Sequence, residues 1–235
     1  MTASADALEH KQGFLNAMSP AGEVDLDTPT RFGRHSWLIT EGLGFKLYPM
    51  CYGTHRALDG VIALAHEHDV APADIAEICI EAGEVQLANL VHHDPQTALD
   101  AKFSMEFAVA MALIARRATL AEVKDSFVQR ADVRALMKKV RIRLVSQPDA
   151  GRNRVSGDGV IVTLNNGKTL ERRFDLPLGH AERPVGADAL WVKFADCTRG
   201  ALSEAQARSF FDLLQRLDTV DSIAEFPVLE AKERA

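Results

Sequence analysis

Apolar positions show no sustained period over residues 1–53 and become periodic from Thr54 onward. A segment of this length without a secondary-structure pattern is unusual at the start of a compact domain. Its abundance of Gly, Pro, Ser and Thr suits two interpretations, a partly disordered tail or a segment that lies against another polypeptide. Residues 1–53 are therefore expected to differ in structure from the rest of the chain.

A helix is predicted directly after Thr54, because apolar residues recur there at helical spacing and Thr54 is a plausible N-cap. This helix is expected to end near His68, ahead of Pro72. The other elements predicted in the first half of the chain are a strand at 75–84, a long helix from Ala98 to Arg117, and shorter helices at 120–128 and 131–139.

A β-hairpin gives the clearest strand signal. Residues 159–176 alternate in the manner of strands on both sides of Asn166–Gly167, a dipeptide favoured in two-residue hairpin turns. The other elements predicted in the second half are a strand at 141–146, a loop at 177–186, helices at 188–197 and 203–217, with Ser203 and Gln206 as a capping box, and a helical turn at 220–225. Interleaved helices and strands with antiparallel pairing predict the α+β class, with a small, mainly antiparallel sheet packed against helices.

The composition limits the kind of protein this can be. With 235 residues, of which 47% are hydrophobic, the chain can bury a substantial core. Its net charge of −6 comes from interspersed acidic and basic residues, and no basic stripe points to nucleic acid. Apolar runs are too short to span a membrane, and the N-terminus lacks a signal-peptide pattern. Cys51, Cys79 and Cys197 are isolated, which fits a reducing cytoplasm without disulfides or structural zinc.

Neither of two histidine pairs predicts a metal site. His66 and His68 lie two positions apart on a predicted helix and so point to different faces. His92 and His93 are adjacent and are expected in a loop, and no cysteine or carboxylate spacing supports metal binding by either pair. The chain also lacks a P-loop and the GxGxxG, HExxH and GxSxG motifs, which excludes the commonest enzymes that can be read from sequence.

Lys46 stands in a segment whose composition indicates a shaped loop. Gly42 and Gly44 precede it and allow close backbone approach, and Tyr48–Pro49 stiffens the exit. His55 lies one residue past the presumed N-cap of the following helix, where the positive helix end disfavours a protonated imidazole and favours a bound carboxylate. These groups would suit a di- or tricarboxylate. An ordinary surface lysine beside a capping-region histidine is the alternative.

Four segments carry a resemblance to a known family. GFKLYPMCYGTHRALDG, residues 44–60, resembles the Lys-x-Tyr-Pro-x-Cys...Thr-His-x-x-(Ile/Leu)-Asp signature of the MmgE/PrpD family. This family contains 2-methylcitrate dehydratase, cis-aconitate decarboxylase and iminodisuccinate epimerase. LEHKQGFLNAMSPAG (8–22), DAKFSMEFAVAMAL (100–113) and WVKFADC (191–197) are similar to family segments that occur in the same order.

The resemblance implies a two-part architecture. Family members combine an all-helical domain with a smaller α+β lid, and the active site lies in the cleft between them. By this comparison residues 1–53 are the crossing segment from the helical domain, 54–186 form the α+β lid, and 187–235 form the C-terminal helical return. The N-terminal helical half has no counterpart in this sequence, so the chain is expected to be a truncated form, a fragment or a subunit.

The resemblance also implies candidate site residues. Lys46 matches the family's active-site lysine on the lid, where a cation can bind a substrate carboxylate and stabilise the enediolate-like charge formed when the α-proton leaves. His55 matches the motif histidine and is the second catalytic candidate. Tyr48 and Cys51 match positions expected to shape the substrate pocket, and Phe107 stands where several members have a tyrosine. The family implies no metal and no cofactor.

The function expected from this resemblance is that of a 2-methylcitrate dehydratase-like lyase fragment or subunit. It would act on a small di- or tricarboxylate by proton abstraction α to a carboxylate, followed by dehydration, decarboxylation or epimerisation, and would be inactive without a helical-half partner chain. The alternative is a non-catalytic lid that self-associates as a homodimer or binds a partner. Nothing in the sequence supports a nucleic-acid or membrane role. The two hypotheses differ in what covers an apolar face that includes Phe14, Leu15, Trp37, Phe210 and Phe211, which would be too large for a soluble monomer to leave exposed. Burial of this face in a homodimer would favour the non-catalytic lid, and a requirement for a helical partner would favour the enzyme.

Overall fold

The computed structural model describes residues 42–145 and 157–222, together with residues 7, 10, 13, 14, 17, 224 and 226. The chain divides into two compact units, Met1–Gly42 and Leu43–Ala235. In the first unit, the described contacts include a backbone hydrogen bond from Gly13 to His10 and one from Phe14 to Ala7. The fold described below is that of the second unit.

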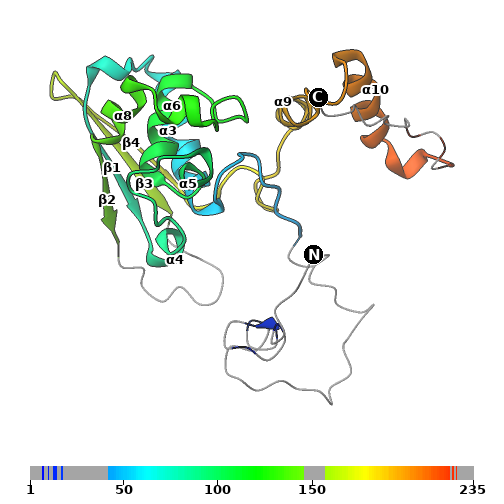
Figure 1. Cartoon of the computed structure of the whole chain (residues 1–235), viewed down its shortest axis with the longest axis horizontal. Helices are drawn as coiled ribbons and strands as arrows, with labels where there is room; N and C mark the ends of the chain where they lie inside the picture. The colour runs from blue at the N-terminus through cyan, green and yellow to red at the C-terminus, as the bar shows by residue number, and fades with distance from the viewer. Residues whose placement is uncertain are drawn as a thin grey trace. The chain divides into compact units, whose positions relative to one another are not determined.

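A four-stranded mixed sheet with the order β2-β1-β3-β4 forms the centre of the second unit (Figure 1). Its strands are β1 (Ile75–Ala82), β2 (Val140–Leu144), β3 (Asp158–Leu164) and β4 (Thr169–Phe174). The β1–β2 pair is parallel, whereas β1–β3 and β3–β4 are antiparallel. Ile80 of β1 stands opposite Ile142 on one side and Val160 on the other.

Alternation along the strands sorts the side chains between the two faces of the sheet. Ile78 and Ile80 of β1 are fully buried with Val160 and Val162 of β3, and they share the face that the helices cover. The intervening residues point to the opposite face, where Glu81 is nevertheless buried because Arg143 of β2 and Arg173 of β4 both pair with it. The hydrophobic core therefore lies on one side of the sheet.

Two long helices supply most of the core on that side. The first, α3 (His55–Glu67), contacts β3, β4 and α6. The second, α6 (Met105–Ala115), is apolar nearly all round, and Met105 and 107–113 are buried, as expected of a helix surrounded by protein. The remaining helices are α4 (Glu84–Leu87), α5 (Ala98–Ala101), α7 (Asp125–Val128), α8 (Ala131–Met137), α9 (Ala187–Thr198) and α10 (Glu204–Leu214), with 3-10 turns at Tyr52–Thr54, Pro72–Asp74 and Leu217–Thr219.

The α+β prediction is confirmed, and the long helix predicted at 98–117 is wrong. Ser104 adopts an extended backbone (φ −122°, ψ 122°), and its hydroxyl accepts a hydrogen bond from the Phe107 N–H. Serine competes with the helix through this local bond, so it ends one helix and caps the next. The second helix then stops at Ala115, because Arg116 takes a left-handed conformation (φ 55°).

The predicted hairpin is present with a different turn. The Leu164 N–H donates to the Lys168 carbonyl, and the Gly167 N–H donates back to the Leu164 carbonyl. Gly167 has φ +84°, which glycine adopts without a steric penalty, so the connection is longer than the two-residue turn predicted from Asn166–Gly167.

Other predicted elements are present with shifted bounds. The helix predicted at 120–128 is limited to Asp125–Val128, and the last helical turn lies at Leu217–Thr219 instead of 220–225. The capping box of Ser203 and Gln206 is confirmed. Thr54 occupies the N-cap position, but its hydroxyl donates to the Cys51 carbonyl instead of capping α3. Among the residues described, no helix is both long enough and apolar enough to cross a membrane.

Candidate active site

Lys46 lies in an irregular segment that runs beside the loop before α9 (Figure 1). The preceding residue, Phe45, donates its N–H to the Gly179 carbonyl at 2.6 Å. Gly179 has φ +96°, and a Cβ there would stand 2.1 Å from the Phe45 carbonyl oxygen, so only glycine allows this close approach. The Lys46 side chain itself is exposed, as a ligand-binding cation must be.

His55 is the first residue of α3 and is fully buried. Its ring packs against those of Tyr48 and Tyr52, with centroids 5.1 and 5.0 Å away, and its Nε2 lies 3.4 Å from the Met50 carbonyl. Burial is the main cause that lowers the pKa of His55 to about 4; the hydrogen bond with the Met50 carbonyl opposes this shift, and the ammonium groups of Lys46 and Lys193 add to it. The imidazole is therefore neutral at neutral pH.

This burial concerns the catalytic role that the resemblance implied for His55, which stays a prediction. The prediction of a disfavoured imidazolium agrees with the lowered pKa, but the main cause is desolvation instead of the helix end. A side chain with no exposed surface cannot touch a ligand in solution in this arrangement. His55 can therefore act on the segment around it, whereas Lys46 is the group that a ligand can reach.

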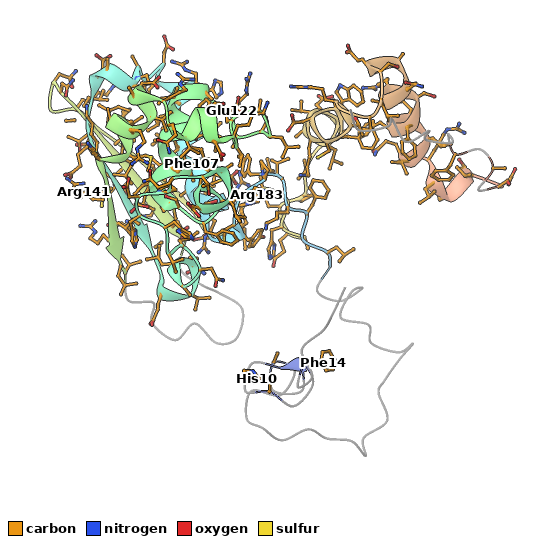
Figure 2. All side chains as sticks on the ribbon, in the orientation of Figure 1. His10, Phe14, Phe107, Glu122, Arg141 and Arg183 are labelled. Carbon is orange, nitrogen blue, oxygen red and sulfur yellow. The ribbon has the colours of Figure 1, made fainter. Side chains whose placement is uncertain are left out.

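Three predicted pocket residues have different surroundings. The Tyr48 hydroxyl is buried and donates to Asp59 Oδ1 at 2.7 Å, and burial together with the Asp59 charge raises the pKa of Tyr48. Cys51 is half-buried, and its N–H donates to the Lys102 carbonyl at 2.8 Å. Phe107 is fully buried in the core on α6 (Figure 2). The structure thus brings Tyr48 and His55 together and leaves Phe107 without exposed surface.

Sequence reasoning missed Asp59, Arg183 and Lys193. Asp59 is the last acidic residue of the 44–60 motif, and a lone carboxylate in an apolar stretch is a signal, because a buried charge needs partners. Arg183 donates to its Oδ2 at 2.6 Å. Lys193 on α9 lies with its Nζ 5.8 Å from the centre of the Phe45 ring. Lys193 lies within the family-like segment WVKFADC, which was a signal for it, whereas no local pattern marks Arg183.

A second buried ion pair lies behind the motif. Arg56 Nη2 stands 2.8 Å from Asp158 Oδ1, and the two residues join the start of α3 to the start of β3. Burial raises the pKa of Asp158 to about 6, although the Arg56 charge opposes this shift. Arg56 also donates to the Asp175 carbonyl at 3.2 Å. This pair fixes the helix that carries His55 and Asp59.

A cavity of about 510 Å³ begins next to the Lys46 segment. Residues 47–49 form one part of its wall and α9 forms another, where Asp196 accepts a hydrogen bond from the Leu120 N–H at 2.8 Å. Most of the lining surface is apolar, but Arg116, Arg117 and Lys193 also line the cavity. Lys193 is one of the two cations that lower the pKa of His55, so the cavity borders the cationic groups that would suit a carboxylate ligand. Among the residues that the structure describes, no cluster of three His, Cys, Asp or Glu could hold a metal ion.

The fold and this site define a class, an α+β domain that carries an exposed lysine on the segment that leads to a buried histidine. Residues 48–219 match the MmgE/PrpD C-terminal domain, and the chain belongs to the MmgE/PrpD family. The family resemblance predicted from the motifs is thereby confirmed.

Two curated relatives have the same described activity. The chain is 26% identical over 219 residues to the cis-aconitate decarboxylase of Mus musculus and 24% identical over 201 residues to that of Homo sapiens. The alignments cover 88% and 83% of this chain but 42% and 41% of the relatives. The chain therefore spans about two fifths of the length of the curated relatives it matches.

Proposed function

We propose that this chain is the lid-bearing part of an MmgE/PrpD-type lyase that acts on a small di- or tricarboxylate. Lys46 binds a substrate carboxylate, and a helical polypeptide supplies the remaining groups of the site. Without that polypeptide the chain is inactive. The similarity to two cis-aconitate decarboxylases supports this substrate class, and the coverage of about two fifths of their length is consistent with a site that needs a second part.

The observation that carries the proposal is the convergence of two cations on one buried neutral ring. Lys46 and Lys193 both lower the pKa of His55, although they lie far apart in the sequence, and Lys193 Nζ stands 5.8 Å from the ring centre of Phe45, the residue before Lys46. Two cations on neighbouring segments suit a ligand that carries more than one carboxylate. Because His55 is neutral at neutral pH, the positive electrostatic potential that acts on a ligand here comes from the two lysines.

This field stabilises the charge that the proposed reactions generate. In dehydration, a C–H proton and a hydroxide leave as water. In decarboxylation, a C–C bond breaks, CO2 leaves, and a proton replaces it on carbon. In both reactions an electron pair on carbon delocalises into a neighbouring carboxylate, and a lysine held against that carboxylate stabilises it. Phe107 is fully buried and has no hydroxyl, so any proton donor must come from elsewhere.

Exposed apolar side chains border the same region and favour a covering polypeptide. Leu43 is 72% exposed, Phe45 39% and Val192 58%. Of the residues expected on a covered face, Phe14 is 58% exposed and Phe211 is buried, while Leu15 and Trp37 lie outside the described residues. Phe210 is half-buried against Phe194 and Phe226. The apolar surface nearest to Lys46 is therefore the one that a partner would cover.

The test combines the purified chain with the helical half of a full-length relative. Turnover of cis-aconitate and 2-methylcitrate is followed by NMR in D2O, which also detects proton exchange without net reaction. We expect turnover or exchange only in the mixture and a loss of at least about 100-fold in Lys46→Ala, the size usual for one positioned group. Lys168→Ala, on the exposed hairpin turn, is the matched control and is expected to keep full activity.

Two outcomes would contradict the proposal. Activity that survives Lys46→Ala would remove the lysine from the site. If the mixture shows neither turnover nor proton exchange and this chain forms a stable folded homodimer, the alternative of a non-catalytic lid that self-associates would be favoured. Sedimentation of the chain with and without the helical half separates these cases, because the proposal expects a mixed complex.

A further inference from the structure

A buried carboxylate links the motif helix to the segment that carries Lys46. Asp59 lies on α3 with only 3% of its side chain exposed, and it accepts three hydrogen bonds. The donors are the Tyr48 hydroxyl at 2.7 Å, the Leu178 N–H at 2.7 Å and Arg183 Nη1 at 2.6 Å. Because a buried carboxylate is costly without donors, these three contacts fix one geometry.

Arg183 extends the linkage to the loop before α9. Besides Asp59, its Nη1 donates to the Leu176 carbonyl at 2.9 Å, and its guanidinium lies 4.7 Å from the centre of the Phe174 ring. Its backbone carbonyl accepts the Gly179 N–H at 2.9 Å. The loop from Leu176 to Arg183 is thus closed on itself by the side chain that also pairs with Asp59.

The same loop holds the residue before Lys46. The Gly179 carbonyl accepts the Phe45 N–H at 2.6 Å, which ties the segment before Lys46 to the loop. On the other side of Lys46, the Tyr48 hydroxyl is bound to Asp59. The lysine therefore stands between two anchored residues, and both anchors lead back to one carboxylate.

We propose that Asp59 and Arg183 are positioning residues that hold the Lys46 segment through the Gly179 loop and the Tyr48 hydroxyl. The inference rests on the proposed function of Lys46 as the carboxylate-binding group. Asp59 is separated from that ligand by Tyr48 and the loop, so it acts through them and touches no substrate. Its loss lets the segment open, and the lysine then spends less time where a carboxylate can be bound.

The first measurement is amide hydrogen exchange of Phe45 by NMR on the full labelled chain. Asp59→Asn keeps the shape of the side chain and removes its charge, and Arg183→Met keeps an unbranched stem without the guanidinium. We expect Phe45 exchange to rise at least about tenfold in each variant, while the Ile80 amide in the sheet still exchanges far more slowly than Phe45, which shows that the segment opens without global unfolding. Asp132→Asn, which breaks an exposed pair with Arg130, is the control and should leave Phe45 exchange unchanged.

A double variant and a conservative variant distinguish a positioning role of Asp59 and Arg183 from a general loss of stability. The double variant Asp59→Asn/Arg183→Met is expected to exchange no faster than the faster single variant, because both act on one linkage. Arg183→Lys, which keeps a cation opposite Asp59, should restore most of the protection. If Asp59→Asn fails to fold, Gly179→Ala opens the same linkage without touching the ion pair, and Gly200→Ala, where a Cβ meets open space, is its control.

Binding of citrate, measured by NMR titration of the Lys46 side chain, gives the functional readout. We expect the dissociation constant to rise at least about tenfold in Asp59→Asn, measured well below the melting temperature of that variant so that both chains are folded. Unchanged Phe45 exchange, or faster exchange with unchanged citrate binding, would overturn the positioning role. If the unsubstituted chain binds no citrate either alone or mixed with the helical half, the proposed function of Lys46 fails, and the exchange data still decide whether Asp59 and Arg183 hold the segment.

Discussion

Removing one oxygen atom from Tyr48 tests the central contact of the site. Tyr48→Phe keeps the ring, which packs against the His55 ring at 5.1 Å, and deletes only the hydroxyl that donates to Asp59 at 2.7 Å. Because burial and the Asp59 charge raise the pKa of Tyr48, the hydroxyl keeps its proton and remains a donor over the whole practical pH range. The substitution therefore isolates a single hydrogen bond.

The expected loss follows from the nature of the acceptor. A hydrogen bond to a charged group contributes about 1.5–3 kcal/mol, roughly twice a bond between neutral groups. Tyr48 is 9% exposed and Asp59 is 6% exposed, so water does not replace the lost donor easily. The Leu178 N–H and Arg183 both donate to Oδ2 of Asp59, so neither replaces the lost hydroxyl as a donor to Oδ1. We expect a decrease of about 2 kcal/mol in the free energy of unfolding.

Urea unfolding followed by tryptophan fluorescence measures this loss, with Tyr52→Phe as the matched control. Tyr52 is 43% exposed and also packs on His55, so the same chemical change there should alter stability by less than about 0.5 kcal/mol. Equal losses in the two variants, or a loss below about 0.5 kcal/mol for Tyr48→Phe, would show that the Tyr48–Asp59 bond does not stabilise the fold as argued. An unchanged slope of free energy against urea confirms that the same surface unfolds.

Three further predictions concern the surroundings of the site. His55 titrates near 6.5 when unfolded and near 4 when folded, so the unfolded chain binds more protons between these values. His55 should therefore lower stability by up to about 3 kcal/mol as pH drops through this window, whereas Asp158, whose pKa burial raises to about 6, contributes in the opposite direction. When urea unfolding is compared at pH 7 and pH 4.5, His55→Gln should lack the His55 contribution and keep that of Asp158. Gly53→Ala places a Cβ 2.2 Å from the Gln86 carbonyl oxygen and should cost about 1–3 kcal/mol by thermal unfolding, whereas no measurable change would contradict this contact. Ser104→Ala removes the cap on the Phe107 N–H and should cost about 0.5–2 kcal/mol by the same assay, and a neutral result would mean that the cap is dispensable.

Local patterns predicted the elements whose structure depends on neighbours in sequence. β1 and the β3–β4 hairpin were expected from alternation, and the Ser203–Gln206 capping box was expected from spacing. The helix predicted at 98–117 failed because an apolar period does not reveal that Ser104 prefers its own hydrogen bond to continued helix. The prediction of a two-residue hairpin turn was wrong for a related reason, since Asn166–Gly167 fits more than one turn type.

For the candidate site, too, the sequence predicted one part and the structure supplied another. The motif drew attention to Lys46, Tyr48, Cys51 and His55, and the proposed roles of these residues remain predictions. The structure added that His55 is buried and neutral and that Lys46 is exposed, a distinction that the motif does not contain. The domain bounds at residues 53 and 186 also remain predictions, and most of the first segment lies outside the described residues.

The sequence by itself determined the α+β class, the family and the identity of the candidate lysine, because each depends on residue types at fixed local spacing. Only the tertiary structure decided what holds that lysine. Asp59 and Arg183 stand 124 positions apart, and no period or motif encodes the distance between them. Their contact exists because α3 packs against β3 and β4 and the chain then returns past the Lys46 segment, which brings a buried carboxylate within reach of the donors that its burial requires.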